Sequence, residues 1–143
     1  MVKLTDEVKK MFEEIRSTPV VAFIATVDAE GKPNVSCKGS LWVLDDENIW
    51  YVEGTGKKTY ENLKKNSYVA VAVASREKSD GYQIKGKAEL LTEGPLYEKA
   101  VKTNEELSRR LGREFPKPKA AVMIKVDEIY SLRSGPKAGE KIA

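Results

Sequence analysis

The stretch VVAFIATVDAEGKPNVSCKGSLWVLDDENIWYVEG, residues 20–54, decides the fold. Three runs rich in β-branched and aromatic residues follow one another here, separated only by the turn sequences DAEGKP and DDEN. Such runs between short turns of Gly, Asp and Asn are typical of strands that pair with their neighbours in sequence. Because each turn is too short for a crossover connection, the stretch predicts an antiparallel meander.

Further elements are expected on both sides of the meander. Apolar residues at helical spacing predict an amphipathic helix within residues 1–17, capped by Thr5 or Asp6 and ended before Pro19. Residues 68–75 and 82–91 have strand composition. In the second of these, period two places Tyr82, Ile84, Gly86, Ala88 and Leu90 on one face.

The C-terminal third is expected to form a helix, a strand and a tail. Pro95 is placed to open the helix, which should end before Gly112. A capping-box pattern at residues 103–106 predicts that this helix breaks and restarts. Residues 116–132 supply a last long strand, and residues 134–143 a polar tail.

This order of elements predicts one mainly β domain, residues 1–143. The strands follow one another directly, whereas a doubly wound nucleotide-binding fold alternates strands with helices. About six antiparallel strands favour a small barrel, since closure removes exposed sheet edges.

Composition excludes several functions. The chain of 143 residues contains no histidine, which excludes His-ligated haem, most catalytic zinc sites and nucleophiles activated by histidine. Its single cysteine, Cys37, cannot form an intramolecular disulfide. A net charge of +3 is too small to argue for nucleic-acid binding. We see no secretory leader, and the longest apolar run, residues 20–27, is too short to cross a bilayer, so a soluble cytoplasmic protein is expected.

The stretch GTGKKTYENL, residues 54–63, is a candidate phosphate site. It is not a Walker loop, because Lys58 follows Gly56-Lys57 where Ser or Thr is required. A helix beginning near Thr59 would instead present unpaired backbone N–H groups, lysine charge and a hydroxyl to an anion. Asn62 would lie on the same helical side, where it could brace the loop or contact the ligand. The alternative is an ordinary solvated helix start.

NVSCKGS, residues 34–40, is the second candidate. Period two places Ser36 and Lys38 on the same face, and a glycine within a strand often marks a bulge or the close approach of a ligand. A half-exposed strand with outward polar residues is the alternative. Cys37 has no histidine to activate it and is interpreted as a packing residue. Trp42 and Trp50 are assigned to the core or an interface.

Taken together, four motifs resemble the FMN-binding split-barrel family related to pyridoxamine 5′-phosphate oxidase. They are the A-T-V-D-x-x-G-x-P-N hairpin, the S-x-K-G strand, the K-K-T-x-x-N helix start and the Y-x-I-x-G-x-A-E strand. The resemblance extends over residues 18–132. It implies a six-stranded antiparallel Greek-key split barrel with flanking helices, which forms a homodimer with two FMN sites at the subunit interface.

Carried over to this sequence, the resemblance assigns the cofactor contacts but no catalytic residue and no metal ligand. It places one group of residues along the flavin and ribityl chain and a second group around the 5′-phosphate, with Asn62 in support. The first group is Val35, Ser36, Cys37 and Lys38, and the second is Thr55, Lys57, Lys58 and Thr59.

The resemblance implies an FMN-dependent oxidoreductase that passes a hydride or electrons between the flavin and an unknown small-molecule substrate or electron donor. The flavin carries the redox chemistry in such proteins, so a chain without histidine is compatible with it. Oxidation of vitamin B6 is not expected, because the chain lacks the C-terminal H-D-R-type element of the true oxidases. Three alternatives stay open: a non-catalytic flavin carrier or electron-transfer module, a deazaflavin-dependent reductase and, ranked low, a nucleic-acid-binding barrel.

Overall fold

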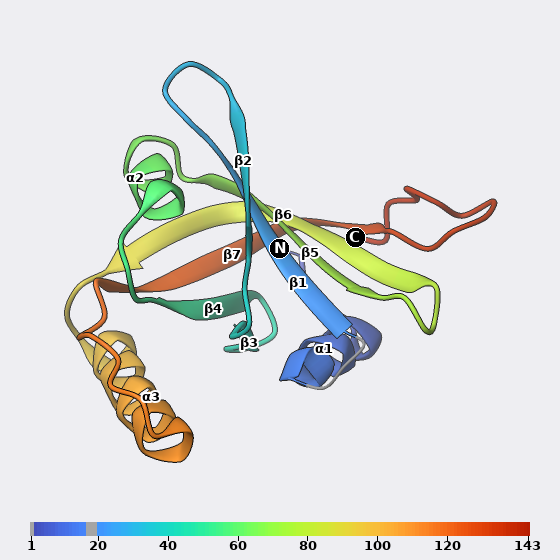
Figure 1. Ribbon diagram of the computed structural model, residues 1–143. Coiled ribbons are helices and arrows are strands. Elements are labelled where there is room, and N and C mark those ends of the chain that lie inside the picture. Colours follow the sequence, from blue (N-terminus) through green and yellow to red (C-terminus); the bar gives the residue numbers. More distant parts are fainter. Residues whose placement is uncertain (1, 17–19) are drawn as a thin grey trace.

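A computed structural model describes residues 2–16 and 20–143. Figure 1 shows a curled sheet with three α-helices around it. The helical elements are α1 (Asp6–Glu13), a 3-10 turn (Glu14–Arg16), α2 (Lys58–Lys65) and α3 (Pro95–Leu111). The strands are β1 (Val20–Val27), β2 (Pro33–Cys37), β3 (Trp42–Val43), β4 (Asn48–Glu53), β5 (Tyr68–Ser75), β6 (Asp80–Leu91) and β7 (Ala120–Ser131).

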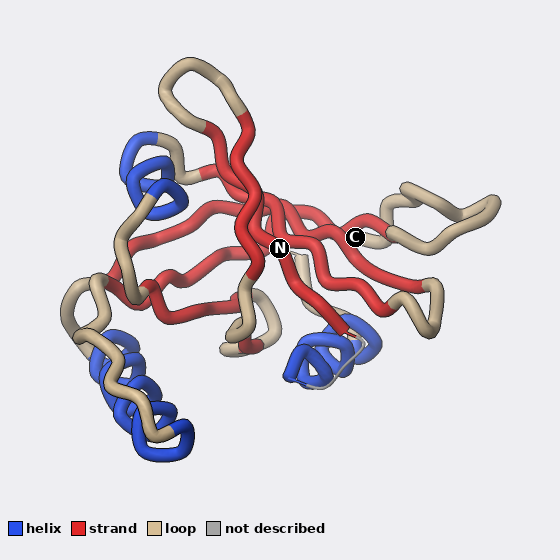
Figure 2. The backbone as a smooth tube through the Cα atoms, in the orientation of Figure 1, coloured by secondary structure: helices blue, strands red, loops and turns tan. Residues whose placement is uncertain are grey.

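One antiparallel sheet contains all of these strands, in the order β2-β1-β5-β6-β7-β4-β3. Its two edge strands, β2 and β3, are consecutive in the chain and are joined by residues 38–41 alone. The sheet must therefore curl until its edges approach each other, as Figure 2 shows. The predicted mainly β split barrel is confirmed.

The predicted number of six strands is wrong, because the described residues form seven. Residues 34–44, predicted as one strand, break into β2 and β3 after Cys37. Lys38 still donates its backbone N–H to the Ala22 carbonyl on β1 (2.9 Å). Beyond that bond the chain leaves β1 and crosses to β4, where Trp42 pairs with Trp50. No single straight strand can pair with both edges of the curled sheet.

The core fills the inside of the curl, with α1 packed at one end. Inward residues of the long strands, such as Ile24, Val71 and Ile124, are completely buried. The apolar residues predicted for the first helix are all buried; they are Leu4, Val8, Met11, Phe12 and Ile15. Its cap is also confirmed, because the Thr5 hydroxyl accepts a hydrogen bond from the backbone N–H of Val8 (3.3 Å). The predicted stop before Pro19 lies outside the described residues.

β6 and β7 pack so closely that one position tolerates only glycine. The register shifts between Lys85 and Gly86, which marks a bulge. A Cβ atom on Gly86 would lie 2.1 Å from the carbonyl oxygen of Lys125 on β7. The predicted faces of β6 are confirmed, since Ile84 and Gly86 are buried while Lys85 and Lys87 are exposed.

The predicted break in the second long helix is wrong. α3 is continuous over 17 residues and ends, as predicted, before Gly112, which has φ +63°. The Thr103 hydroxyl does not cap a new helix; it donates to the Lys99 carbonyl one turn back (2.8 Å).

The chain after β7 turns back on that strand. Lys141 forms a bridge with Tyr130, and the N–H of Ile142 donates to the Ile129 carbonyl (2.8 Å). Figure 1 shows this tail on the opposite side of the sheet from α2. Among the residues that the structure describes, no helix is both long and apolar enough to span a membrane.

Candidate functional site

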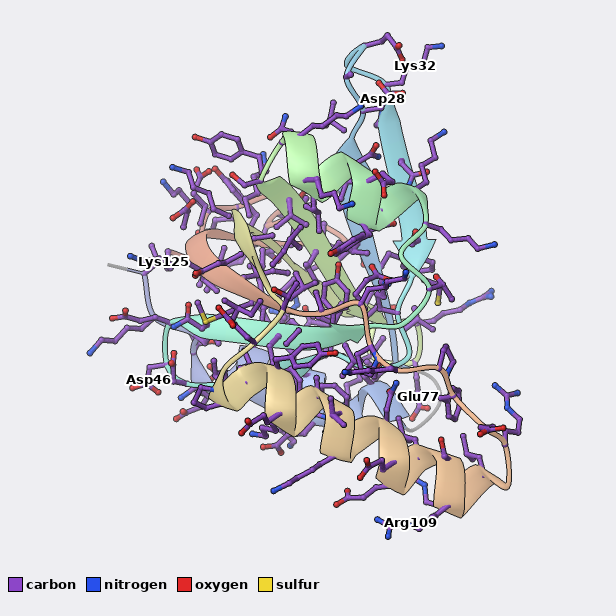
Figure 3. All side chains as sticks on the ribbon, turned by 90° about the vertical axis from the view of Figure 1, so that its left-hand side faces the viewer. Asp28, Lys32, Asp46, Glu77, Arg109 and Lys125 are labelled. Carbon is purple, nitrogen blue, oxygen red and sulfur yellow. The ribbon has the colours of Figure 1, made fainter. Side chains whose placement is uncertain are left out.

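A pocket of about 180 Å³ lies where β2, the end of β4 and the start of α2 meet. Figure 3 faces this side of the molecule, with α2 alongside β2 and above β4. The lining residues are Asn34, Ser36, Lys38, Glu53, Thr55, Lys57, Lys58 and Thr59. Six of the nine predicted cofactor residues are among them, so the fold brings together two stretches that the sequence separates by about 20 positions.

The start of α2 gives the pocket backbone hydrogen-bond donors. Among the described residues no side chain caps the helix at Lys57, and the first intrahelical bond runs from the Glu61 N–H to the Lys57 carbonyl (2.9 Å). The N–H groups of the first turn therefore lack intrahelical acceptors, and the helix dipole adds a partial positive charge at the same place. Gly56 has φ +66°, a conformation that glycine adopts without strain, and it turns the loop into the helix.

Two hydroxyl groups connect β2 with α2. The oxygen atoms of Ser36 and Thr59 are 2.7 Å apart, and the Asn34 side-chain amide donates to Thr59 (3.4 Å). Each hydroxyl has one hydrogen, and one of the two lies in the bond between them. The other hydrogen stays available to a ligand in the pocket.

The pocket also contains four charged side chains. Lys57 and Lys58 are exposed at its rim. Lys38 is deeper, with its Nζ atom 3.9 Å from Oε1 of Glu53 and 4.6 Å from the centre of the Tyr51 ring. Glu53 is only 3% exposed, and its Oε1 has no hydrogen-bond partner among the described residues.

Tyr51 lies under Lys38 and is fully buried. Its hydroxyl also has no hydrogen-bond partner in the described part of the chain. Burial raises the pKa of the Tyr51 phenol well above its ordinary value, and the negative charge of Glu53 raises this pKa further. The ring beneath the ammonium group of Lys38 is therefore that of a neutral phenol.

The other three predicted residues do not line this pocket. Asn62 is buried and donates to the Thr26 hydroxyl (3.0 Å), which ties α2 to β1. Val35 and Cys37 are exposed, and period two places them on the face of β2 opposite to Asn34 and Ser36. Their assignment as flavin contacts stays a prediction.

Sequence reasoning missed two residues of the pocket. Asn34 ends the hairpin motif and begins the candidate stretch NVSCKGS, but neither pattern assigns a role to its side chain. Glu53 ends the apolar run IWYVE, and period two places it on the inward face with Tyr51. A carboxylate on the inward side of a strand is the signal that could have identified it, because such groups are rarely buried without a purpose.

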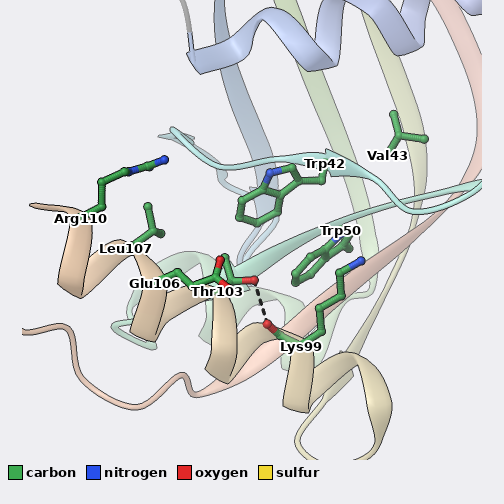
Figure 4. Close-up of a pocket in the computed structure, with 8 residues that line it drawn as sticks. All are labelled: Trp42, Val43, Trp50, Lys99, Thr103, Glu106, Leu107 and Arg110. Atoms are coloured by element: carbon green, nitrogen blue, oxygen red, sulfur yellow. Dashed lines mark hydrogen bonds between the residues drawn. The ribbon is translucent and has the colours of Figure 1, made fainter.

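A second pocket, of about 450 Å³, lies on the other face of β4, beneath α3 (Figure 4). The rings of Trp42 and Trp50 are 4.8 Å apart and tilted by 30°. The ammonium group of Lys99 lies 5.4 Å from the centre of the Trp50 ring. Val43, Thr103, Glu106, Leu107 and Arg110 complete the lining.

Comparison with known proteins agrees with this architecture. A family model described as pyridoxamine 5′-phosphate oxidase matches residues 4–133. An uncharacterised protein of Methanocaldococcus jannaschii is 39% identical over 145 residues, which cover 100% of this chain and 90% of that protein. Neither finding names an activity for this chain.

Two solved structures have folds similar to that of this chain. HupZ of Group A Streptococcus is 37% identical, with a TM-score of 0.78 over 95% of this chain and 99% of that one. An FMN-binding protein from Syntrophomonas wolfei is 20% identical, with a TM-score of 0.69 over 90% of each chain, a likeness of fold alone. The chain belongs to the pyridoxamine 5′-phosphate oxidase family of split-barrel proteins.

Proposed function

We propose that this chain is an FMN-binding protein that acts as a flavin-dependent oxidoreductase. The observation that carries the proposal is the pocket between β2 and α2. Helix N–H groups, a free hydroxyl hydrogen and three lysines converge on a space that suits the terminal phosphate of FMN. Family membership supports the same ligand.

The size of the pocket limits it to the phosphate end of the cofactor. About 180 Å³ is smaller than the 300–1,000 Å³ typical of pockets for whole drug-sized ligands. The ring system of FMN would therefore extend beyond the pocket and needs another surface to cover it. A second copy of the chain is the partner that we propose.

An exposed apolar surface on β1, β2 and β5 supports a homodimer. Val35 is 64% exposed and Phe23 is 40% exposed. The register places Cys37 opposite Phe23, and Phe23 opposite Ala72 on the next strand. Contiguous exposed apolar surface is a common feature of the sites at which proteins associate.

The chain's own residues would bind and orient the cofactor, and FMN would supply the capacity to transfer a hydride or electrons. Lys57, Lys58, Ser36 and Thr59 would hold the phosphate, and Lys38 would place a positive charge beyond it.

Cofactor binding is tested first. Purified protein should be yellow, release FMN on denaturation and bind FMN more tightly than riboflavin, which lacks the phosphate. A colourless protein that takes up neither flavin would refute the proposal. Tighter binding of a deazaflavin than of FMN would instead identify the alternative cofactor, which the phosphate pocket does not distinguish.

Activity and assembly are separate questions. Rapid reduction of the bound flavin by a nicotinamide nucleotide, followed by turnover with an acceptor, would identify an enzyme. A flavin that exchanges electrons only with redox proteins would identify a carrier.

Sedimentation should show a dimer, and Phe23→Asp should yield a monomer with weakened FMN binding. A wild-type monomer with full affinity for FMN would refute an FMN site formed by two copies of the chain.

A further inference from the structure

Glu53 is an unexpected residue for an anion-binding pocket. A carboxylate repels phosphate, and this one is 3% exposed, where water screens its charge poorly. The pocket would attract a generic anion more strongly without it. Its presence therefore requires an explanation beyond affinity.

Glu53 is held in place by its backbone and by its side chain. Its carbonyl accepts the N–H of Lys119 (2.8 Å), and the residue pairs with Ala120 at the end of β4. Oε2 accepts the backbone N–H of Gly56 (3.3 Å), which fixes the turn into α2. Oε1 faces the ammonium group of Lys38 at 3.9 Å. The carboxylate thus acts on both the loop and a lysine of the pocket.

The charged side chains that line the pocket give it a net positive charge. Lys38, Lys57 and Lys58 contribute three positive charges, and Glu53 contributes one negative charge. The net charge of the lining is therefore +2. A phosphate monoester carries about −1.5 to −2 at pH 7, so this lining neutralises one terminal phosphate.

We infer that Glu53 sets the charge of the pocket and positions Lys38, so that the site gains little affinity from a second phosphate group on its ligand. This inference rests on the proposed FMN site. Lys38 is confined between the Glu53 carboxylate and the face of the Tyr51 ring, so one of the three lysines is already neutralised before the ligand arrives. A diphosphate would bring an excess of negative charge close to the Glu53 carboxylate.

The decisive experiment is a cycle of charge variants. Lys38→Met leaves a net charge of +1, Glu53→Gln leaves +3, and the double variant returns the pocket to +2. We expect Lys38→Met to weaken FMN binding by about tenfold or more, which corresponds to loss of one charge-assisted contact. The double variant should regain most of that affinity, although it retains neither member of the pair. A purely structural pair would lose affinity further in the double variant.

Ligand charge gives an independent readout. Inorganic phosphate and pyrophosphate are used as competitors of FMN, with flavin fluorescence as the signal. The wild-type protein should bind the two anions within about threefold of each other, and Glu53→Gln should prefer pyrophosphate by about tenfold. Glu77→Gln, an exposed substitution with the same change of net charge, is the control and should keep the wild-type ratio.

The outcomes separate the two proposals. A wild-type protein that binds neither FMN nor phosphate would overturn the proposed function. FMN binding without recovery in the double variant would overturn only the role of Glu53. A wild-type protein that already binds pyrophosphate clearly more than threefold tighter than phosphate would do the same, even if Glu53→Gln did not fold.

Discussion

Lys58 offers the most direct test of the phosphate pocket. It is the first residue of α2, lines the pocket and is exposed to solvent. Lys58→Met keeps the length of the side chain but removes its charge. A hydrogen bond to a charged group contributes about 1.5–3 kcal/mol, and solvent screening favours the lower half of that range. The dissociation constant of FMN should therefore rise by about 10- to 40-fold, at about 1.4 kcal/mol for each factor of ten.

The matched control lies on the same helix. Lys65→Met removes the same charge from the last turn of α2, which is not part of the pocket. Fluorescence titration of each variant with FMN, and with riboflavin as the phosphate-free ligand, separates the local contact from general electrostatics. Only the combination of Lys58→Met with FMN should show the loss. An equal loss with riboflavin, or an equal loss in Lys65→Met, would refute the assignment.

Three further substitutions test buried contacts of the barrel and of α2. Gly86→Ala should destabilise the protein by about 1–3 kcal/mol or more, because its Cβ would overlap a β7 carbonyl. Gly39→Ala is the control and should be nearly neutral in the same thermal melts, because a Cβ added there would meet no other described residue within 4 Å. Asn62→Ala should lower the free energy of unfolding in urea by about 1–3 kcal/mol, since it leaves the buried Thr26 hydroxyl unpaired, and an unchanged midpoint would contradict this. Tyr51→Phe should not destabilise the protein, because it removes a buried hydroxyl that lacks a partner in the described chain. The pKa of the Tyr51 phenol is raised in the folded protein, so the unfolded chain loses the phenolic proton first as the pH rises above 10.0. The stability of the wild-type protein should therefore fall above this pH more steeply than that of Tyr51→Phe.

The strands were predictable because their patterns are local. Period two in residues 82–91 identified the buried face of β6, and Thr5 and Gly112 marked helix ends through their own backbone chemistry. The break after Cys37 was not predictable in the same way. It depends on the distance between the two edges of the curled sheet, which no local pattern encodes.

Errors at the site and in α3 have similar causes. Thr103 has the side chain of a helix cap, but the helix continues because its hydroxyl bonds to a carbonyl one turn back. Ser36 and Thr59 were predicted from separate motifs, and their direct contact depends on α2 packing against β2. Glu53 was overlooked because a carboxylate at the end of a strand is usually a solvated turn residue, and only the fold shows that it is buried.

Because residues 38–41 cross between the two edges of the sheet, a bound phosphate is expected to affect the stability of the barrel. Ser36 and Lys38 belong to the edge-strand side of the barrel, whereas Lys58 and Thr59 belong to α2. A phosphate bound by all four residues would link the β2 edge of the barrel to α2. Ligand at 100 times its dissociation constant would add about 2.7 kcal/mol to the stability of the folded chain. Amide hydrogens of β2 and of the first turn of α2 should then exchange with solvent more slowly, while those of the tail on β7 keep their rate.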